Sequence, residues 1–183
     1  MKRFCLVANM LLVLSLFSLM TLPPARAASA SGVSAYSSLH GKACQTIDTS
    51  AHGATRLCRG VAGYALVVYD NDDRSSVDIV APDNSLYPLS YWDVVTPGYS
   101  TVGQKAEWRM ETRKGKRVPT ALLVRLSRLD PRSPGEMIAV ARIYPDGACV
   151  VFRGELLDTA VEAAARRAAV DPASKCLGYL NSD

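Results

Sequence analysis

The sequence contains few residues of the kinds that carry chemistry. It has only two histidines, His40 and His52, and no serine that stands in a Gly-x-Ser-x-Gly pattern. No two of its cysteines form a Cys-x-x-Cys pair. These absences exclude the nucleophile-elbow, thioredoxin-like and zinc-clip signatures that spacing alone can reveal. We therefore expect no catalytic residue, no metal and no cofactor, although a Ser-His-Asp arrangement assembled from distant residues stays open.

The chain also has little net charge once its first residues are set aside. It contains 21 lysines and arginines and 17 acidic residues, which gives a formal net charge of +4. Lys2, Arg3 and Arg26 lie in an N-terminal segment with the pattern of an export signal. Without them, 18 basic residues face 17 acidic ones, a net charge of +1. Nucleic acids are bound through clustered positive charge, so we expect no nucleic-acid partner.

The N-terminal segment holds the one long apolar run of the sequence. Lys2 and Arg3 precede an apolar stretch over 4–22, and Ala25-Arg26-Ala27 supplies a small-x-small cleavage site. We predict a signal peptide over 1–27 that is cleaved after Ala27. The mature protein is then periplasmic or secreted, soluble and not membrane-spanning. An uncleaved anchor is the alternative, because about 19 apolar residues just suffice to cross a bilayer.

The 156 residues that follow the signal peptide are enough for one domain with an ordinary core. Residues 28–38 are small and polar, and we interpret them as a flexible leader. Residues 39–183 show no internal repeat and no second boundary. They are expected to form a single domain.

Strand patterns dominate the middle of this domain. Residues 106–113 alternate apolar and charged side chains, which is the period of a half-buried strand. Lys114-Gly115 offers a tight turn, and the apolar run at 118–126 supplies the second strand of a hairpin. Five further strands are expected at 44–47, 64–69, 76–80, 137–144 and 148–153.

One helix is expected over about 156–170, where Leu157, Val161, Ala164 and Ala168 form an apolar stripe. Asp171-Pro172 ends it, because the residue before a proline is pushed out of the helical region. We predict an α+β fold, in which an antiparallel sheet of about six or seven strands carries this C-terminal helix on one face.

Four cysteines follow the signal peptide: Cys44, Cys58, Cys149 and Cys176. An even number in an exported chain favours two disulfides. The spacing favours the local pairing, Cys44 with Cys58 and Cys149 with Cys176, which is one of three connectivities. The rival interpretation is a metal site that combines the first two cysteines with the two histidines. Its spacings of four, eight and six residues match no zinc clip.

An acidic run at 70–73 resembles the start of a calcium loop. An EF-hand would need glycine at the sixth position and glutamate at the twelfth, and these positions hold Ser75 and Ala81. We interpret the run as an exposed hairpin turn, with weak calcium binding left to experiment.

Two features could form a binding surface. Aromatic residues gather in a proline-punctuated stretch over 86–102, where they could stack on a glycan or a protein. A basic turn at 113–117 could contact an anionic partner. The alternatives are aromatic residues that cover one end of the sheet and a solvated hairpin tip. The candidate surface comprises Tyr87, Tyr91, Trp92, Tyr99, Arg113, Lys114, Lys116 and Arg117.

Short motifs along nearly all of the mature chain carry a resemblance. They are Cys44, Leu57-Cys58-Arg59-Gly60 with Gly63-Tyr64, Ala106-Glu107-Trp108-Arg109, Pro119-Thr120-Ala121-Leu122-Leu123-Val124-Arg125, Cys149, and an Ala-Arg-Arg-Ala-Ala helix before Cys176. In these motifs the chain resembles a set of small exported bacterial proteins of unknown function, mostly alphaproteobacterial. The resemblance supports export and two disulfides, and it implies no activity.

These observations favour an exported, non-enzymatic protein that binds another macromolecule, either an envelope protein or a glycan. One alternative is a hydrolase or accessory enzyme that acts on cell-wall material. Another is an inhibitor of lysozyme-like enzymes, since periplasmic lysozyme inhibitors carry a Ser-Gly-x-x-Tyr loop. The segment from Ser31 to Tyr36 is similar to that loop, with one residue inserted.

Overall fold

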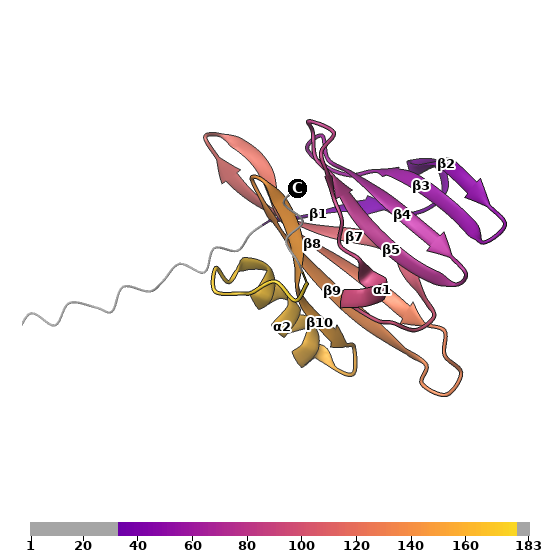
Figure 1. Ribbon diagram of the computed structural model, residues 1–183. Helices are drawn as coiled ribbons and strands as arrows, with labels where there is room; N and C mark the ends of the chain where they lie inside the picture. The colour runs from indigo at the N-terminus through magenta and orange to yellow at the C-terminus, as the bar shows by residue number, and fades with distance from the viewer. Residues whose placement is uncertain (1–32, 179–183) are drawn as a thin grey trace, which may run out of the picture. The chain divides into compact units, whose positions relative to one another are not determined.

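Ten strands form a single mixed sheet in the computed structural model, which describes residues 33–178 (Figure 1). The strands are β1 Val33–Ser38, β2 Cys44–Ser50, β3 Gly53–Arg59, β4 Ala65–Asn71, β5 Arg74–Val80, β6 Leu86–Tyr87, β7 Ser100–Arg113, β8 Lys116–Arg128, β9 Gly135–Tyr144 and β10 Gly147–Glu155. Their order is β10-β9-β8-β7-β5-β4-β3-β2, with β1 paired to β7 and β6 to β5. The predicted signal peptide and residues 28–32 lie outside the described residues.

The predicted fold class was wrong in three respects. The described residues are mostly sheet, the sheet has ten strands, and it is mixed, because β5 and β7 run parallel where Arg74 pairs with Ser100. The seven expected strands are all present, and β1, β3 and β6 are added to them. The single C-terminal helix is present as α2, Thr159–Val170.

No alternation of side chains marks the three added strands in the sequence. Residues 33–38, which we placed in a flexible leader, form β1 because the edge of β7 offers them backbone partners from Lys105 to Met110. Strand β3 lies within the polar segment between the first two cysteines and pairs on both sides, with β2 and β4. Strand β6 has only two residues and pairs with the end of β5. Backbone pairing rather than side-chain alternation defines these strands.

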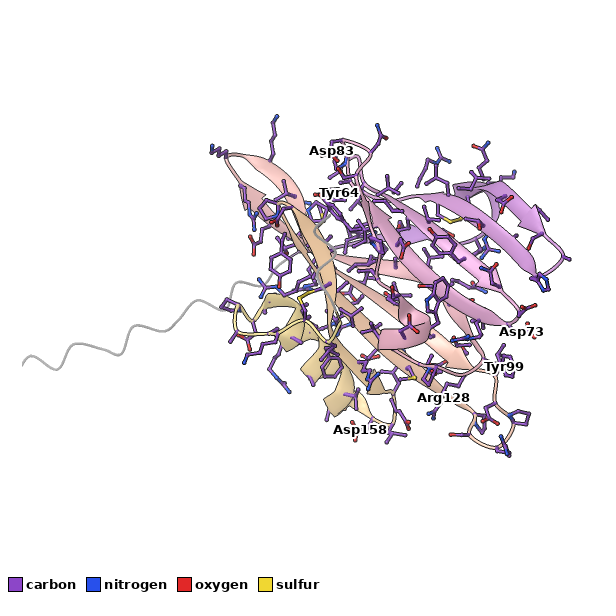
Figure 2. The ribbon with its side chains drawn as sticks, in the orientation of Figure 1. Tyr64, Asp73, Asp83, Tyr99, Arg128 and Asp158 are labelled. Atoms are coloured by element: carbon purple, nitrogen blue, oxygen red, sulfur yellow. A yellow bond between two sulfur atoms is a disulfide. The ribbon has the colours of Figure 1, made fainter. Side chains whose placement is uncertain are left out.

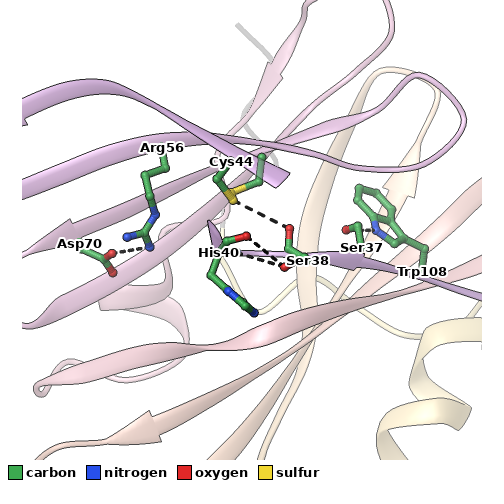
Figure 3. Close-up of a disulfide and its surroundings, with 8 residues drawn as sticks. Ser37, Ser38, His40, Cys44, Arg56, Asp70 and Trp108 are labelled. Atoms are coloured by element: carbon green, nitrogen blue, oxygen red, sulfur yellow. Dashed lines mark hydrogen bonds and ion pairs between the residues drawn. A yellow bond between two sulfur atoms is a disulfide. The ribbon is translucent and has the colours of Figure 1, made fainter. Parts of the chain in front are cut away.

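The main core lies between strands β4 and β5 on one side and strands β7 to β10 on the other. Strands β4 and β5 contribute Leu66, Val68, Val77 and Ile79, and these pack with inward-facing side chains of β7 to β10. Trp108 of β7 is fully buried in this cluster, and its indole Nε1 donates a hydrogen bond to Ser37 Oγ at 2.9 Å (Figure 3). This bond ties β1 to the core of the domain.

A second core forms where α2 covers the opposite face of β8, β9 and β10 (Figure 1). The helix begins after Asp158, whose carboxylate accepts the backbone N–H groups of Ala160 at 2.8 Å and Val161 at 3.2 Å. Such an N-cap satisfies two of the N–H groups that the first turn leaves unpaired. The helix ends at Val170, directly before Asp171-Pro172, as predicted.

Both disulfides of the local pairing are present. Cys44 and Cys58 are directly opposite one another on β2 and β3, with their Cα atoms 3.9 Å apart. Cys149 of β10 is bonded to Cys176, which follows α2, over a sequence separation of 27 residues. The first bridge closes a hairpin, and the second ties the segment after the helix to the sheet.

Candidate functional site

The aromatic segment that the sequence singles out runs along the edge of β5. It contains β6, the short helix α1 at Tyr91–Val94, and the approach to β7. Two side chains of β5 hold it in place: Ser76 Oγ accepts the Tyr91 N–H at 3.0 Å, and Asp78 Oδ1 accepts the Leu89 N–H at 2.9 Å. These bonds replace backbone pairing between β5 and residues 89–91. They also give the buried side chains of Ser76 and Asp78 hydrogen-bond partners.

Burial around Asp78 raises the pKa values of three side chains. Burial raises the pKa of the Asp78 carboxyl, although the Leu89 N–H and the Tyr69 hydroxyl both favour its charged form. Burial also raises the pKa of Tyr69 to about 12, with a further contribution from the negative charge of Asp78. The pKa of the fully buried Tyr91 hydroxyl rises for the same two reasons. Removing charged Asp78 from water therefore costs stability.

The raised pKa of Asp78 predicts a pH dependence with a definite sign. The folded state holds the Asp78 proton more tightly than the unfolded state, so the free energy of unfolding falls as pH rises from the ordinary pKa of 3.8 through the folded-state pKa. Asp78→Asn keeps an acceptor for Leu89 and removes this decline. In urea unfolding measured from pH 3.5 to 8, the free energy of unfolding of the variant should rise relative to that of the wild type across that window. Above the window, the difference between the two should be constant.

Asp83 provides a control of opposite sign. Hydrogen bonds from Ser85 lower the pKa of this exposed carboxyl. The charged Asp83 carboxylate therefore stabilises the fold above its ordinary pKa, and this stabilisation is lost as pH falls through the folded-state pKa. Asp83→Asn should be less stable than the wild type near neutral pH and equally stable in acid. Parallel behaviour of the two variants would contradict the assignment at Asp78.

The four aromatic residues of the candidate surface do not share one surface. Tyr87 is 9% exposed and Tyr91 is fully buried, and both belong to the main core. The Tyr91 hydroxyl has no hydrogen-bond partner among the described residues. Trp92 is half-buried, whereas Tyr99 is 58% exposed. Only these last two remain available to a partner.

The basic turn lies far from the exposed aromatic residues. Arg113, Lys114, Lys116 and Arg117 are all exposed around the β7–β8 turn, where Lys114 and Gly115 take the positive φ values of 50° and 77°. Tyr99 directly precedes the other end of β7, which has 14 residues. At about 3.3 Å per residue this separates the two features by roughly 40 Å. Figures 1 and 2 place the turn and Tyr99 at opposite ends of the strand.

Trp92 instead meets the acidic turn between β4 and β5. Its ring packs edge-on against Tyr69, with ring centroids 5.9 Å apart and an interplanar angle of 64°. Its carbonyl oxygen accepts a hydrogen bond from Arg74 at 3.5 Å. A pocket of about 330 Å³ opens here, and we call it the Trp92 pocket. It is lined by Asn71, Asp72, Arg74, Trp92 and Asp93.

The sequence shows no sign that these five residues converge. The sequence predicts an exposed hairpin turn at 70–73 and a separate aromatic stretch over 86–102. They meet because the segment after β6 returns along β5 to the β4–β5 turn, where the Ser100 N–H donates to the Asp73 carbonyl at 2.7 Å. Tyr99 and Asp73 are consequently neighbours (Figure 2). That return path is a property of the topology and leaves no local pattern.

The histidines lie apart from one another. His52 Nδ1 lies 3.1 Å from Asp72 Oδ1, and both side chains are exposed. The backbone of His40 is hydrogen-bonded to the Ser38 hydroxyl, next to the first disulfide (Figure 3). Among residues 33–178, no serine hydroxyl is hydrogen-bonded to a histidine ring, and no three His, Cys, Asp or Glu side chains are grouped to hold a metal ion.

The segment similar to the lysozyme-inhibitor loop is only partly within the described residues. Ser31 and Gly32 lie outside them. Val33 to Tyr36 belong to β1 and pair with Met110 to Glu107 of β7. This part of the segment is therefore a strand within the sheet and not a loop.

Comparison of the chain with protein-family models, with curated proteins and with solved structures gives no match in any of the three. The resemblance to small exported bacterial proteins therefore stays a prediction. No helix in the described part of the chain is long and apolar enough to cross a membrane. Two disulfides are consistent with a location outside the cytoplasm.

Proposed function

We propose that this protein works outside the cytoplasm as a non-enzymatic binding protein, and that it recognises a neutral glycan of the cell envelope in the Trp92 pocket. The observation that carries the proposal is the position of the Trp92 indole. It is oriented by Tyr69 and lines a pocket whose other residues supply carboxylates, an amide and a guanidinium. A sugar ring presents an apolar face that can pack on an indole and hydroxyl groups that pair with such polar side chains.

The polar lining favours a neutral ligand over an anionic one. Asp72 and Asp93 line the pocket with one cation, Arg74. Asp73 adds another carboxylate to the same turn, and Asp70 is already paired with Arg56 at 2.5 Å. Anionic polymers would be repelled here, whereas hydroxyl groups can donate to the carboxylates. The volume of about 330 Å³ lies near the lower limit for ligand pockets, which suits one end or one residue of a glycan.

The backbone that carries Trp92 is held in place before the pocket, which lowers the cost of binding. The Leu89 and Tyr91 N–H groups are bonded to buried side chains of β5, so this segment is fixed at two points directly before Trp92. Binding then requires little further ordering of the backbone of this segment.

The test is binding of the mature protein to two probes: purified peptidoglycan sacculi by co-sedimentation and triacetylchitotriose by calorimetry. Trp92→Ala should weaken binding at least tenfold, about 1.4 kcal/mol, because it removes the stacking surface. Trp92→Phe should retain part of the affinity. Lys114→Gln, in the distant basic turn, serves as the off-site control and should bind like the wild type.

Two results would reject the proposal. One is a folded wild-type protein that binds neither probe, and the other is a Trp92→Ala variant that binds both as well as the wild type does. Release of soluble sugar from the sacculi would favour the hydrolase alternative over a binding protein.

A further inference from the structure

A second pocket lies on the outer face of the sheet, between β1 and α2. The helix covers β8, β9 and β10, and β1 extends the sheet beyond β7, so a groove remains between them. Its volume is about 370 Å³. Leu123 of β8 and Ile138 of β9 form its apolar floor, and the ring of Tyr36, 60% exposed, stands beside it. We call it the β1–α2 groove. It shares no residue with the Trp92 pocket.

A bulge in β7 shapes one side of the groove. The register between β7 and β8 shifts between Val102 and Ala106, so that three residues, 103–105, face the single Arg125. Gly103 permits this close approach, because a Cβ there would lie 3.2 Å from the Arg125 carbonyl oxygen. Bulges of this kind redirect side chains and are common beside functional sites. Gly103, Lys105 and Arg125 all line the groove.

The carboxylate of the groove is already satisfied. Glu107 Oε1 accepts a hydrogen bond from Ser34 Oγ at 2.6 Å and lies 3.5 Å from Arg109. Its other oxygen lies 3.4 Å from Arg166 of α2. Because this half-buried carboxylate already has three partners, it is a poor site for a further cation.

The three cations of the groove differ in their partners. Arg125 is paired with Glu162 of α2 and lies 3.8 Å from Glu136 of β9, and Arg166 lies 3.4 Å from Glu107. Lys105 is exposed and forms no ion pair with any residue in the range 33–178. Lys105, Arg125 and Arg166 therefore line the groove with N–H donors, and an apolar floor lies between them.

We propose that the β1–α2 groove binds a small amphiphilic anion, a sulfonate or carboxylate carried on an aromatic body. The anionic group takes Lys105 and the guanidinium groups as its partners. The aromatic body lies on Leu123 and Ile138 against the Tyr36 ring. The groove volume of about 370 Å³ suits a ligand of a few fused or linked rings. This inference is independent of the glycan proposal, since it concerns different residues and a ligand of different charge.

The test uses two fluorescent probes that differ chiefly in charge. They are 8-anilinonaphthalene-1-sulfonate, an anion, and N-phenyl-1-naphthylamine, which is uncharged. The anion should bind saturably and at least tenfold more tightly than the neutral probe at low ionic strength, with a preference that shrinks as salt is added. Lys105→Gln should weaken binding of the anion roughly three- to tenfold and leave binding of the neutral probe unchanged. Tyr36→Ala should weaken binding of both probes.

Glu107→Gln supplies a change of opposite sign. It keeps an acceptor for Ser34 and removes the negative charge that engages Arg166, so the anionic probe should bind roughly threefold more tightly or better. Lys114→Gln removes a lysine from the distant basic turn and should leave the affinity for both probes unchanged.

Three results would overturn the proposal. They are no saturable binding of the anion, equal affinity for the two probes, and equal weakening by Lys105→Gln and Lys114→Gln. Weaker binding of the anion by Glu107→Gln would likewise contradict it, provided that circular dichroism shows the variant to be folded. Loss of glycan binding in a Trp92 variant would not bear on these outcomes.

Discussion

Replacing Trp108 with alanine should lower the free energy of unfolding by about 3–5 kcal/mol, the usual cost of removing a large buried aromatic side chain. Trp108 is fully buried between the two parts of the sheet, and its ring lies beside Tyr64 with centroids 6.1 Å apart. Its environment cannot collapse easily, because it includes backbone directly after β3: a Cβ on Gly60 would already lie 2.8 Å from the indole. A typical domain has a total free energy of unfolding of roughly 5–15 kcal/mol, so this loss is a large share of the stability of the fold.

The contribution of the indole N–H can be separated from that of the ring. Trp108→Phe keeps an aromatic ring but leaves the buried Ser37 hydroxyl without its donor, which should cost about 1–3 kcal/mol. Tyr99→Ala removes an aromatic residue that is 58% exposed and should change stability by no more than about 0.5 kcal/mol. Urea unfolding of the three variants is the measurement. A loss below about 1 kcal/mol in Trp108→Ala would mean that the tryptophan is not in the core.

The hairpin that contains Trp108 is the part of the fold that sequence reasoning predicts best. Residues 106–110 of its first strand alternate, with Trp108 inward and Glu107 outward, its second strand is an apolar run, and its turn contains a glycine, so all the information is local. Strand β1 is the opposite case. Its inward positions hold only small side chains such as Ala35 and Ser37. Such a strand is defined by the edge it pairs with, and the identity of that edge is not a local property.

The same distinction explains the candidate site. Tyr91 and Trp92 are adjacent aromatic residues, and nothing local indicates that the first is buried and the second lines a pocket. Their orientation depends on Ser76 and Asp78, which accept N–H groups across 15 and 11 positions of sequence. In a sequence, these two residues are ordinary polar positions of a strand. Only the fold shows that they are acceptors for a neighbouring segment.

Removing the second disulfide should have the next largest effect. Cys149→Ala combined with Cys176→Ala opens a loop of 27 residues, which corresponds to about 3.6 kcal/mol in the loop-entropy treatment. Removing the first, by Cys44→Ala and Cys58→Ala, opens a loop of 14 residues and corresponds to about 3 kcal/mol. Global unfolding therefore separates the two bridges poorly, and a local measurement is needed.

The two bridges differ in what they hold. Cys176 lies between Lys175 and Leu177, and the Leu177 N–H donates to the Val150 carbonyl at 2.8 Å. Without the Cys149–Cys176 bond, this segment is attached to the sheet only by such contacts, so the Leu177 amide should exchange faster and trypsin should cut sooner after Lys175. The variant that lacks the Cys44–Cys58 bond should lose stability but keep both forms of protection under native conditions, because its hairpin is distant in the sheet order from β10. Equal loss of protection in the two variants would show that the second bridge stabilises the whole domain without fixing the segment after α2.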